Sequence, residues 1–365
     1  MRPTYLEVNL SQLKKNTEAI RAQVAPAKIM PMVKANAYGH GVEGVAPFIE
    51  PYVDYLGVAI VEEGIHLREL GIRKPILVAG GTLPEQVPLF AEYDLILTGS
   101  SSDLLDTAEE VSYATGTRIK THLKIDTGME RVGVREYEVE SFILKSSAYK
   151  HIVIEGIYTH LANSELADRT FSNMQFERFQ EVLDIYRKHS LPTPPLRHVC
   201  NSGGILNLPE AYFDMVRPGV LFYGVYPGDE VNRVVDVKPA LTWRSHVAYS
   251  KRTRPGRPIS YGSLWQAEAE TGIVTIPCGY ADGYFRRMTN RAQVVIHQKK
   301  YPQVGRICMD QFMVNVGDDD IKVGDEVILL GESIAAEDFA QWTGTNKYEV
   351  MTNISARVPR VYVNE

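Results

Sequence analysis

The stretch MPMVKANAYGHG, residues 30–41, places a lysine at the end of a short apolar run and small and glycine residues directly after it. This pattern predicts a buried strand over residues 28–33, which ends at Lys34 and is followed by a turn. Lysine is rarely buried without a partner, so Lys34 taken alone would be an ordinary solvated cation where a strand meets a loop. Its role therefore depends on what the rest of the chain places beside it.

Apolar runs with strand character continue to about residue 225 and alternate with amphipathic stretches such as SSDLLDTAEEV and DRTFSNMQFERFQEVLDIYRKH. Eight strand-then-helix units in a row predict a parallel sheet covered by helices, and that number favours a closed (β/α)8 barrel over an open sheet. The last unit is the weakest, because Pro218 and Gly219 interrupt its strand. The runs after the first lie at residues 55–59, 75–80, 94–98, 119–125, 152–158, 197–200 and 215–224.

After about residue 230 the pattern changes to strand-like runs separated by turn-rich segments. The runs are RSHVAYSKR, TGIVTIPC, AQVVIH, QFMVNV and DEVILLG, and only IAAEDFAQWTG has the pattern of a helix. This region is predicted to be a second, all-β domain.

Composition excludes several classes of protein. A net charge of −6 over 365 residues argues against a general nucleic-acid binder. No apolar run approaches the roughly 20 residues of a membrane span, and the N-terminus lacks the apolar core of a signal peptide. Cys200, Cys278 and Cys308 are isolated and form no CxxC, which argues against disulfides and a cysteine–zinc site. We therefore expect a cytoplasmic protein without a structural metal.

Polar residues gather at the predicted C-terminal ends of the barrel strands, where barrel proteins assemble their chemistry. Several cations converge on one site only if an anion neutralises them, so the set predicts a negatively charged ligand. The residues are Lys34, Lys124, Asp126, Arg131, His160, Asn201, Ser202 and Arg217.

Ser202 and the glycines around it suggest a phosphate site. The hydroxyl and the open backbone of Gly203, Gly204 and Gly219 suit a phosphate at a helix N-terminus, although Ser202 could also be a simple N-cap. A phosphate site beside a strand-end lysine points to a phosphorylated aldehyde held as a Schiff base, as pyridoxal phosphate is. Aldol-type Schiff-base chemistry competes with this interpretation.

Nine motifs in order give the chain a resemblance to a known family. The sequence resembles the alanine racemases, which are pyridoxal-phosphate enzymes, over essentially its whole length. It departs from their usual pattern at Cys200 and Val132, where alanine and leucine are common. The motifs are VKANAYGHG (33–41), KIDTGMERVG (124–133), THLANSE (159–165), NSGG (201–204), VRPGVLFYG (216–224), ISYGS (259–263), GYADGY (279–284), VGRICMDQ (304–311) and NISARVPR (353–360).

The resemblance implies an isomerase that interconverts L- and D-alanine and supplies D-alanine for peptidoglycan. It implies a homodimer with shared active sites and no nucleic-acid or membrane partner. It also implies three segments: a strand within residues 1–10 that joins the β-domain, a barrel at 11–230 that binds pyridoxal 5'-phosphate, and a β-rich domain at 231–365 that completes the partner's site.

The resemblance assigns cofactor roles to residues of both domains. Lys34 would carry the cofactor covalently, and Arg217 would face the pyridine nitrogen with His160 behind it. The phosphate would be held by Tyr38, Ser202, Tyr348 and the backbone of Gly219 and Val220.

For the substrate, the resemblance implies that Arg131 and the Met309 backbone hold the carboxylate. Tyr280 would line the entry, with Asp310 near it, and Lys124 is a candidate for carbamylation that would position Arg131. No metal is implied.

Racemisation itself asks for two bases, because one fixed group cannot reach both faces of a carbon. Lys34 and Tyr261 are the expected pair, and the cations Arg131 and Arg217 should lower the pKa of both. Arg217 can only donate hydrogen bonds, so it should leave the pyridine nitrogen unprotonated and limit transamination.

Three other functions compete. An amino-acid decarboxylase of the same architecture would need a carboxylate where Arg217 stands. A non-enzymatic pyridoxal-phosphate-binding protein with a lone barrel would not need the second domain. A racemase of serine or of many amino acids differs only in pocket size, which the residues do not state.

Overall fold

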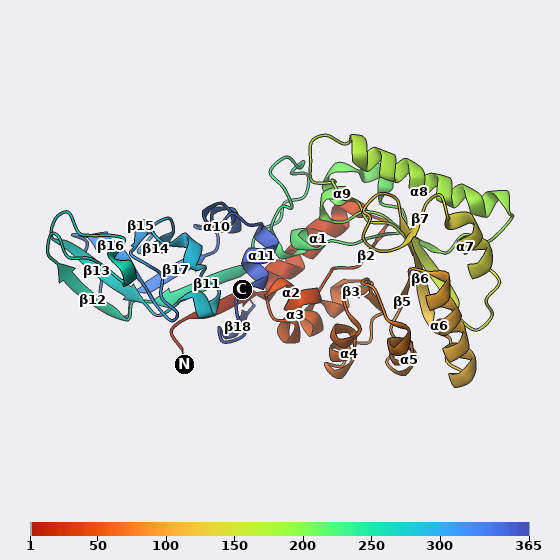
Figure 1. The fold of residues 1–365 in the computed structure, drawn as a ribbon, viewed down its shortest axis with the longest axis horizontal. Helices are drawn as coiled ribbons and strands as arrows, with labels where there is room; N and C mark the ends of the chain where they lie inside the picture. The colour runs from red at the N-terminus through yellow and green to blue at the C-terminus, as the bar shows by residue number, and fades with distance from the viewer. Residues whose placement is uncertain (1, 365) are drawn as a thin grey trace. The chain divides into compact units, whose positions relative to one another are not determined.

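The computed structural model describes residues 2–364, which divide into two compact units (Figure 1). The barrel unit comprises Leu13–Ala37 and Val42–Lys238. The β unit comprises the described residues up to Gln12, Tyr38–Gly41 and the described residues from Pro239 onward. No helix among residues 2–364 is long and apolar enough to cross a membrane.

Eight parallel strands close the barrel, as predicted. The strands are short and mostly buried because helices cover one face and the barrel interior fills the other. The strands are β2 (Lys28–Ile29), β3 (Leu56–Val58), β4 (Ile76–Val78), β5 (Leu97–Gly99), β6 (Lys120–Asp126), β8 (Val153–Tyr158), β9 (Leu196–His198) and β10 (Met215–Val216). Where regular pairing lapses, the ring is joined by bridges between Met32 and Gly57 and between Leu77 and Ile96, and by a hydrogen bond of 2.9 Å from Arg217 N–H to the Cys200 carbonyl.

Two predicted strands are reduced to two regular residues each. The run at residues 28–33 is regular only over β2, and the run at 215–224 only over β10. Pro31 and Pro218 have no N–H to donate to a neighbouring strand, so each proline ends the ladder. After β10 the chain passes into a 3-10 turn, η4 (Val220–Tyr223).

Helices follow the strands on the outside of the barrel (Figure 1). The two amphipathic stretches quoted from the sequence both form helices, as α6 and α8. Helix α6 shows the local reason for its bounds, because the Ser101 side chain accepts from the Leu104 N–H and Gly116 ends the helix at φ 70°. The helices are α1 (Leu10–Val24), α3 (Val42–Ile49), α4 (Val61–Glu69), α5 (Val87–Glu92), α6 (Ser102–Thr115), α7 (Val139–Ser146), α8 (Thr170–Lys188) and α9 (Ser202–Asn207), and the short strand β7 (Val134–Arg135) pairs with β6.

The β unit is built on one nine-stranded sheet, in the order β12-β13-β16-β15-β14-β17-β11-β1-β18. The N-terminal strand β1 lies between β11, to which it is antiparallel, and β18, to which it is parallel. The strands are β1 (Tyr5–Asn9), β11 (Leu241–His246), β12 (Tyr249–Thr253), β13 (Thr271–Ile276), β14 (Gln293–Ile296), β15 (Lys299–Val304), β16 (Phe312–Gly317), β17 (Glu326–Leu330) and β18 (Arg360–Val363).

The expectation of a single helix in this unit was wrong. Besides α10 (Ala336–Thr343), the chain forms α11 (Lys347–Thr352). The Asn346 side chain accepts from the Glu349 N–H and so caps α11 at a point where the sequence has no long apolar periodicity.

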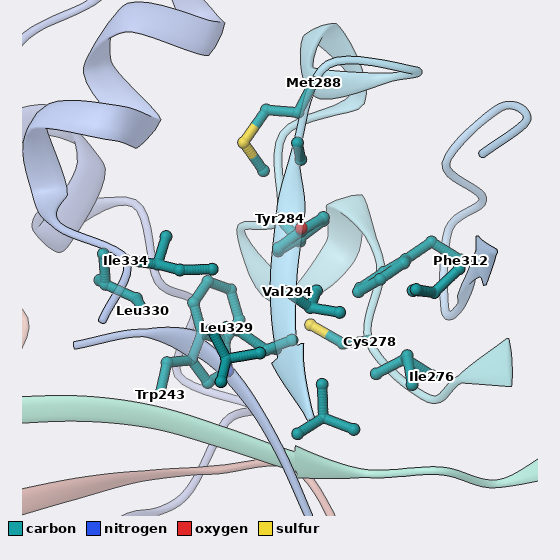
Figure 2. Packing of buried hydrophobic residues seen from close by; sticks show 14 of the residues in the cluster. Trp243, Ile276, Cys278, Tyr284, Met288, Val294, Phe312, Leu329, Leu330 and Ile334 are labelled. Atoms are coloured by element: carbon teal, nitrogen blue, oxygen red, sulfur yellow. The ribbon is translucent and has the colours of Figure 1, made fainter. Parts of the chain in front are cut away.

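Aromatic and aliphatic side chains pack together in the core of the β unit (Figure 2). The rings of Tyr284 and Phe312 stack with centroids 4.3 Å apart, and Trp243 meets Tyr284 edge-on at 5.9 Å. This packing gives the β unit a hydrophobic core of its own, so it can hold its surface residues firmly.

The division into units departs from the expected boundary at residues 230 and 231. The segment 231–238 belongs to the barrel unit, because Lys238 N–H donates to Asn16 Oδ1 at 3.0 Å and Asn232 N–H donates to Asn207 Oδ1 at 3.0 Å. Tyr38–Gly41 belongs to the β unit, which interrupts the stretch that follows Lys34.

Candidate active site

Lys34 opens a left-handed turn, α2 (Lys34–Tyr38). Ala35, Asn36, Ala37 and Tyr38 all have φ between 50° and 54°. The turn was predicted, but not that non-glycine residues would carry it at a cost of about 1–2 kcal/mol each. A strained backbone of this kind persists only where the surrounding structure stabilises it. Such segments cluster at functional sites.

Glu63 holds the backbone beside Lys34. Its carboxylate accepts from Ala35 N–H at 2.6 Å and from Ala59 N–H at 2.8 Å. Glu63 stands at the third position of α4, where a glutamate commonly caps the start of a helix. This capping pattern is the sequence feature from which Glu63 could have been identified.

The environment favours a neutral amine at Lys34. Burial lowers the pKa of Lys34, and the nearby Arg131 guanidinium lowers it further, while Glu63 opposes both. A larger share of Lys34 is therefore unprotonated at neutral pH than for a solvated lysine. This agrees with the direction expected from the sequence.

The residues after the turn pack within the β unit. A Cβ on Gly39, which has φ 82°, would lie 2.2 Å from the Met351 carbonyl oxygen, so only glycine fits there. The Arg360 Nε donates to the Gly39 carbonyl at 3.1 Å. The rings of Tyr38 and Tyr348, both expected at the phosphate, lie 6.1 Å apart.

Ser202 lies where two candidate phosphate-binding segments meet. Its Oγ accepts from Gly219 N–H at 2.9 Å and from Leu221 N–H at 3.3 Å, on either side of Val220. Ser202 is not the N-cap of α9, because Asn201 occupies that position and its side chain accepts from Gly204 N–H at 3.0 Å. The Ser202 hydroxyl therefore faces the β10–η4 turn.

Arg217 is buried among neutral acceptors. Its Nη2 donates to the carbonyls of Thr159 at 2.7 Å and Val199 at 2.9 Å. His198 Nδ1 lies 2.8 Å from Nη1, and His160 Nδ1 lies 3.4 Å from Nη2, so the expected contact with His160 is present but long. Burial lowers the pKa of Arg217 to about 10, which still leaves it charged at neutral pH.

Lys124 is a buried amine whose Nζ has no hydrogen-bond partner among the described residues. The Nζ lies 4.6 Å from the centroid of the Tyr158 ring. Burial, and then the charge of Arg217, holds the pKa of Lys124 well below its usual range. The environment of Lys124 therefore favours the neutral amine over the ammonium ion.

Asp126 shapes the loop that carries Arg131. Its carboxylate accepts from the N–H groups of Gly128, Glu130 and Arg131 at 2.9, 3.1 and 3.0 Å. Burial alone would raise the pKa of Asp126, but these donors outweigh it and hold the pKa low. The Arg131 side chain is exposed and lines a cavity of about 370 Å³, together with Ser100, Asp126, Glu130, Val132, Gly133, Arg135 and Glu138.

Tyr261 stands in the open on the β unit, with 70% of its surface exposed. The residue before it, Ser260, has φ 65° and ψ −177°, a region that glycine alone adopts without strain. The Ser260 hydroxyl donates to the Arg306 carbonyl at 2.6 Å and helps to hold this geometry. The backbone is thus strained directly beside the expected second base.

Tyr280, Met309 and Asp310 form a second group on the β unit. The Met309 carbonyl accepts from Ala281 N–H at 3.0 Å, which joins its segment to η6 (Tyr280–Asp282). Arg357 ties the group together, because it contacts the buried Asp282 at 2.5 Å and Asp310 at 2.7 Å. Met309 and Tyr280 are 52% and 41% exposed.

The donor set of the barrel unit fits a phosphorylated pyridine aldehyde. It offers a lysine with a lowered pKa at Lys34, a hydroxyl beside backbone N–H groups at Ser202, and a fixed donor at Arg217. No cluster of three or more histidine, cysteine or carboxylate side chains within residues 2–364 could hold a metal ion.

Comparison with known proteins shows the family to which the chain belongs. The family model of the alanine racemase N-terminal domain matches residues 8–227, and that of the C-terminal domain matches residues 240–362. The alanine racemase of Carboxydothermus hydrogenoformans is 42% identical over 372 residues, with all of both chains covered.

Solved structures give the same result. The alanine racemase of Clostridium difficile 630 superposes with a TM-score of 0.95 at 37% identity, over 100% of this chain and 97% of that one. The alanine racemase of Bartonella henselae with covalently bound pyridoxal phosphate has a TM-score of 0.91 at 28% identity, over all of both chains. The chain described here therefore belongs to the alanine racemase family.

Proposed function

We propose that this protein interconverts L- and D-alanine and that Lys34 binds its pyridoxal phosphate covalently. The observation that carries the proposal is the barrel donor set, in which Lys34, Ser202 and Arg217 offer an amine, a phosphate cradle and a donor that cannot become an acceptor. Membership of a pyridoxal-phosphate-dependent family supports it. When bound, the cofactor supplies an electron-withdrawing ring that makes the α-proton of an attached amino acid acidic.

The cofactor-holding residues act by position. Lys34 supplies the amine, and its lowered pKa keeps that amine available. The phosphate would be held by Ser202 and the backbone of Gly219 and Val220, with Tyr38 and Tyr348 contributing their hydroxyls. Arg217 would donate to the pyridine nitrogen, where a decarboxylase of similar architecture would need a carboxylate.

Two bases on opposite faces of the α-carbon would move the proton. Lys34 would serve one face and Tyr261 the other, because one fixed group cannot do both. Tyr261 is 70% exposed on its own chain, which suits a residue that acts in the site of a second copy. We therefore propose a homodimer in which each β unit completes the partner's barrel site. A cytoplasmic enzyme that supplies D-alanine for peptidoglycan is the setting we propose.

Substrate binding would depend on Arg131 and the Met309 backbone. Asp126 holds the Arg131 loop in place through three N–H groups, so the guanidinium can receive a carboxylate with little reorganisation. Tyr280 and Asp310, which are linked to Met309 through η6 and Arg357, would border the entry.

Lys124 would be carbamylated. A neutral, unpartnered amine adds CO₂ to give a carbamate anion and releases one proton, and burial then isolates the product from water. The new anion would accept from Arg131, whose charge lies close enough to influence Lys124. Alanine, with its small side chain, is the substrate we propose, and serine is the nearest alternative.

The proposal is tested on the purified protein with L-alanine, D-alanine and D-serine as substrates. We expect D-alanine formation together with a visible absorbance that borohydride fixes covalently onto the peptide containing Lys34. Absence of racemisation in a protein that carries the chromophore would overturn the activity. Fixation onto another lysine would overturn the assignment of Lys34.

A further inference from the structure

A chain of hydrogen bonds crosses the inside of the barrel from Arg217 to Glu155. Arg217 Nη1 lies 2.8 Å from His198 Nδ1, and His198 Nε2 lies 2.9 Å from His122 Nδ1. His122 Nε2 then lies 3.3 Å from Glu155 Oε2. Both histidines are fully buried, and 24% of the Glu155 side chain is exposed. No site role was expected of Glu155, His122 or His198.

The two ends of this chain fix the direction of every hydrogen bond in it. A guanidinium can only donate, so His198 Nδ1 must be unprotonated and its proton must lie on Nε2. His198 therefore donates to His122 Nδ1, which places the His122 proton on Nε2. That proton is donated to Glu155, because a carboxylate can only accept. A single arrangement of protons satisfies all three contacts.

The rings are held in the orientation that this arrangement needs. Tyr158 stacks on His198 with centroids 4.5 Å apart and planes 9° apart. A Cβ on Gly156 would lie 2.7 Å from the Cγ and Nδ1 atoms of His122, so the absence of a side chain there leaves room for the ring. Burial lowers the pKa of both histidines, which keeps them neutral.

Glu155 also supplies a negative charge that compensates the positive charge of Arg217. The direct hydrogen-bond partners of Arg217 among the described residues are carbonyls and imidazole nitrogens, and none is a carboxylate. A buried cation without a counter-charge is costly, and hydrogen bonds in series polarise one another in a low-dielectric interior. The carboxylate that ends the chain is therefore placed to stabilise the guanidinium through two neutral rings.

We propose that Glu155 is a positioning residue for the reaction, which acts through His122 and His198 to fix the acceptor that holds Arg217 and to balance its charge. This inference rests on the proposed function, because Arg217 is there assigned to the pyridine nitrogen. Glu155 has no role in the proposed function itself, so the inference adds a residue to it.

The test compares Glu155→Gln with the wild-type holoenzyme. The matched control is Glu140→Gln, which removes a carboxylate 2.6 Å from His189 Nε2 on the barrel surface. Imidazole ¹⁵N resonances are recorded on histidine-labelled protein and assigned with single His→Asn variants. The kcat, the KM for alanine, and the ratio of racemisation to transamination are measured on the same samples.

In the wild type and in Glu140→Gln, we expect His122 and His198 to show one tautomer each, with the proton on Nε2. In Glu155→Gln the amide can donate as well as accept, so His122 should show a mixture. We expect kcat to fall about tenfold or more, as for the loss of a hydrogen bond to a charged group, with KM within about twofold of wild type. The share of turnovers that end in transamination should rise.

Unchanged tautomers together with a kcat equal to that of Glu140→Gln would overturn the proposal. If Glu155→Gln does not fold, Gly156→Ala serves in its place, because it displaces the His122 ring and leaves the carboxylate in position; it should also mix the tautomers, and failure to do so would count against the proposal. If the wild type does not racemise alanine, the proposed function fails, and the tautomer measurement alone decides whether Glu155 orders Arg217.

Discussion

In the barrel unit Lys124, Ser202 and Arg217 are buried, whereas Tyr261, Tyr280 and Met309 on the β unit are exposed. Arg217 is 3% exposed and Tyr261 is 70% exposed. Burial gives the barrel groups shifted pKa values and fixed directions before any ligand arrives. The β-unit groups acquire a comparable environment only when another surface covers them. In the site proposed above, the barrel residues are therefore fixed by their own chain, whereas the β-unit residues need a second surface.

The largest loss of activity is expected from a substitution in the barrel unit. Lys34→Ala removes both the covalent anchor and one base, so activity should fall by roughly 10⁴-fold or more. Lys28→Ala, at the exposed start of β2, is the control and should keep wild-type activity. Racemisation assays on both variants check this, and more than a tenth of wild-type activity in Lys34→Ala would break the comparison.

The second largest loss of activity is expected from a substitution in the β unit. Tyr261→Phe removes one base and leaves its ring, so the rate should fall by roughly 10²–10⁴-fold. The solvent isotope effects should differ between the L-to-D and D-to-L directions, because only one face has lost its base. Tyr249→Phe, which is 57% exposed on β12, is the control. Equal, undiminished rates in both directions would exclude Tyr261 as a base.

A third change alters the kind of reaction more than its rate. Arg217→Glu places a carboxylate where the structure has a donor, so the pyridine nitrogen should become protonated and transamination should rise about tenfold or more relative to racemisation. The control is Arg187→Glu on α8, because the ion pair that Arg187 forms with Asp184 is solvent-exposed, whereas the pair between Arg197 and Asp214 is partly buried. Product analysis by chiral chromatography measures the ratio, and an unchanged ratio would refute the role of Arg217.

The smallest effect should come from the strained backbone. Ser260→Gly relieves a conformation that costs about 1–3 kcal/mol, offset by about 0.5–1 kcal/mol of glycine entropy, so stability should stay equal or rise slightly. Activity should fall about two- to fivefold, because Tyr261 is held less firmly. Ser250→Gly in the extended strand β12 should only destabilise the protein. Thermal unfolding and kinetics together separate these outcomes.

Much of the fold was predictable because parallel barrel strands are short, apolar and regularly spaced. The residues at their ends, such as Lys34, Ser202 and Arg217, stood out as polar groups after apolar runs. The hydrogen-bond chain through His122 and His198 did not stand out, because inward positions inside a strand look the same in sequence as outward ones. The packing against Gly156 and the hydrogen bond with His198 show which way His122 points.

Other features that the sequence did not predict have local causes. The left-handed turn after Lys34 uses alanine and asparagine, so no glycine marks it. Asn201 caps α9 one residue before the serine that was the expected candidate. Strand β15 carries lysines and Pro302 and therefore has no apolar pattern, although it pairs with both β14 and β16.

The central claim is that the buried half of one chain works with the exposed half of another. It is tested by co-expressing Lys34→Ala and Tyr261→Phe subunits with different affinity tags and purifying the mixed dimer. Such a dimer has one site with both bases, so about half of wild-type activity is expected, although each variant alone should keep about a hundredth of it or less. If Tyr261 acts within its own chain, no subunit of the mixed dimer has both bases, and the absence of activity would contradict the account.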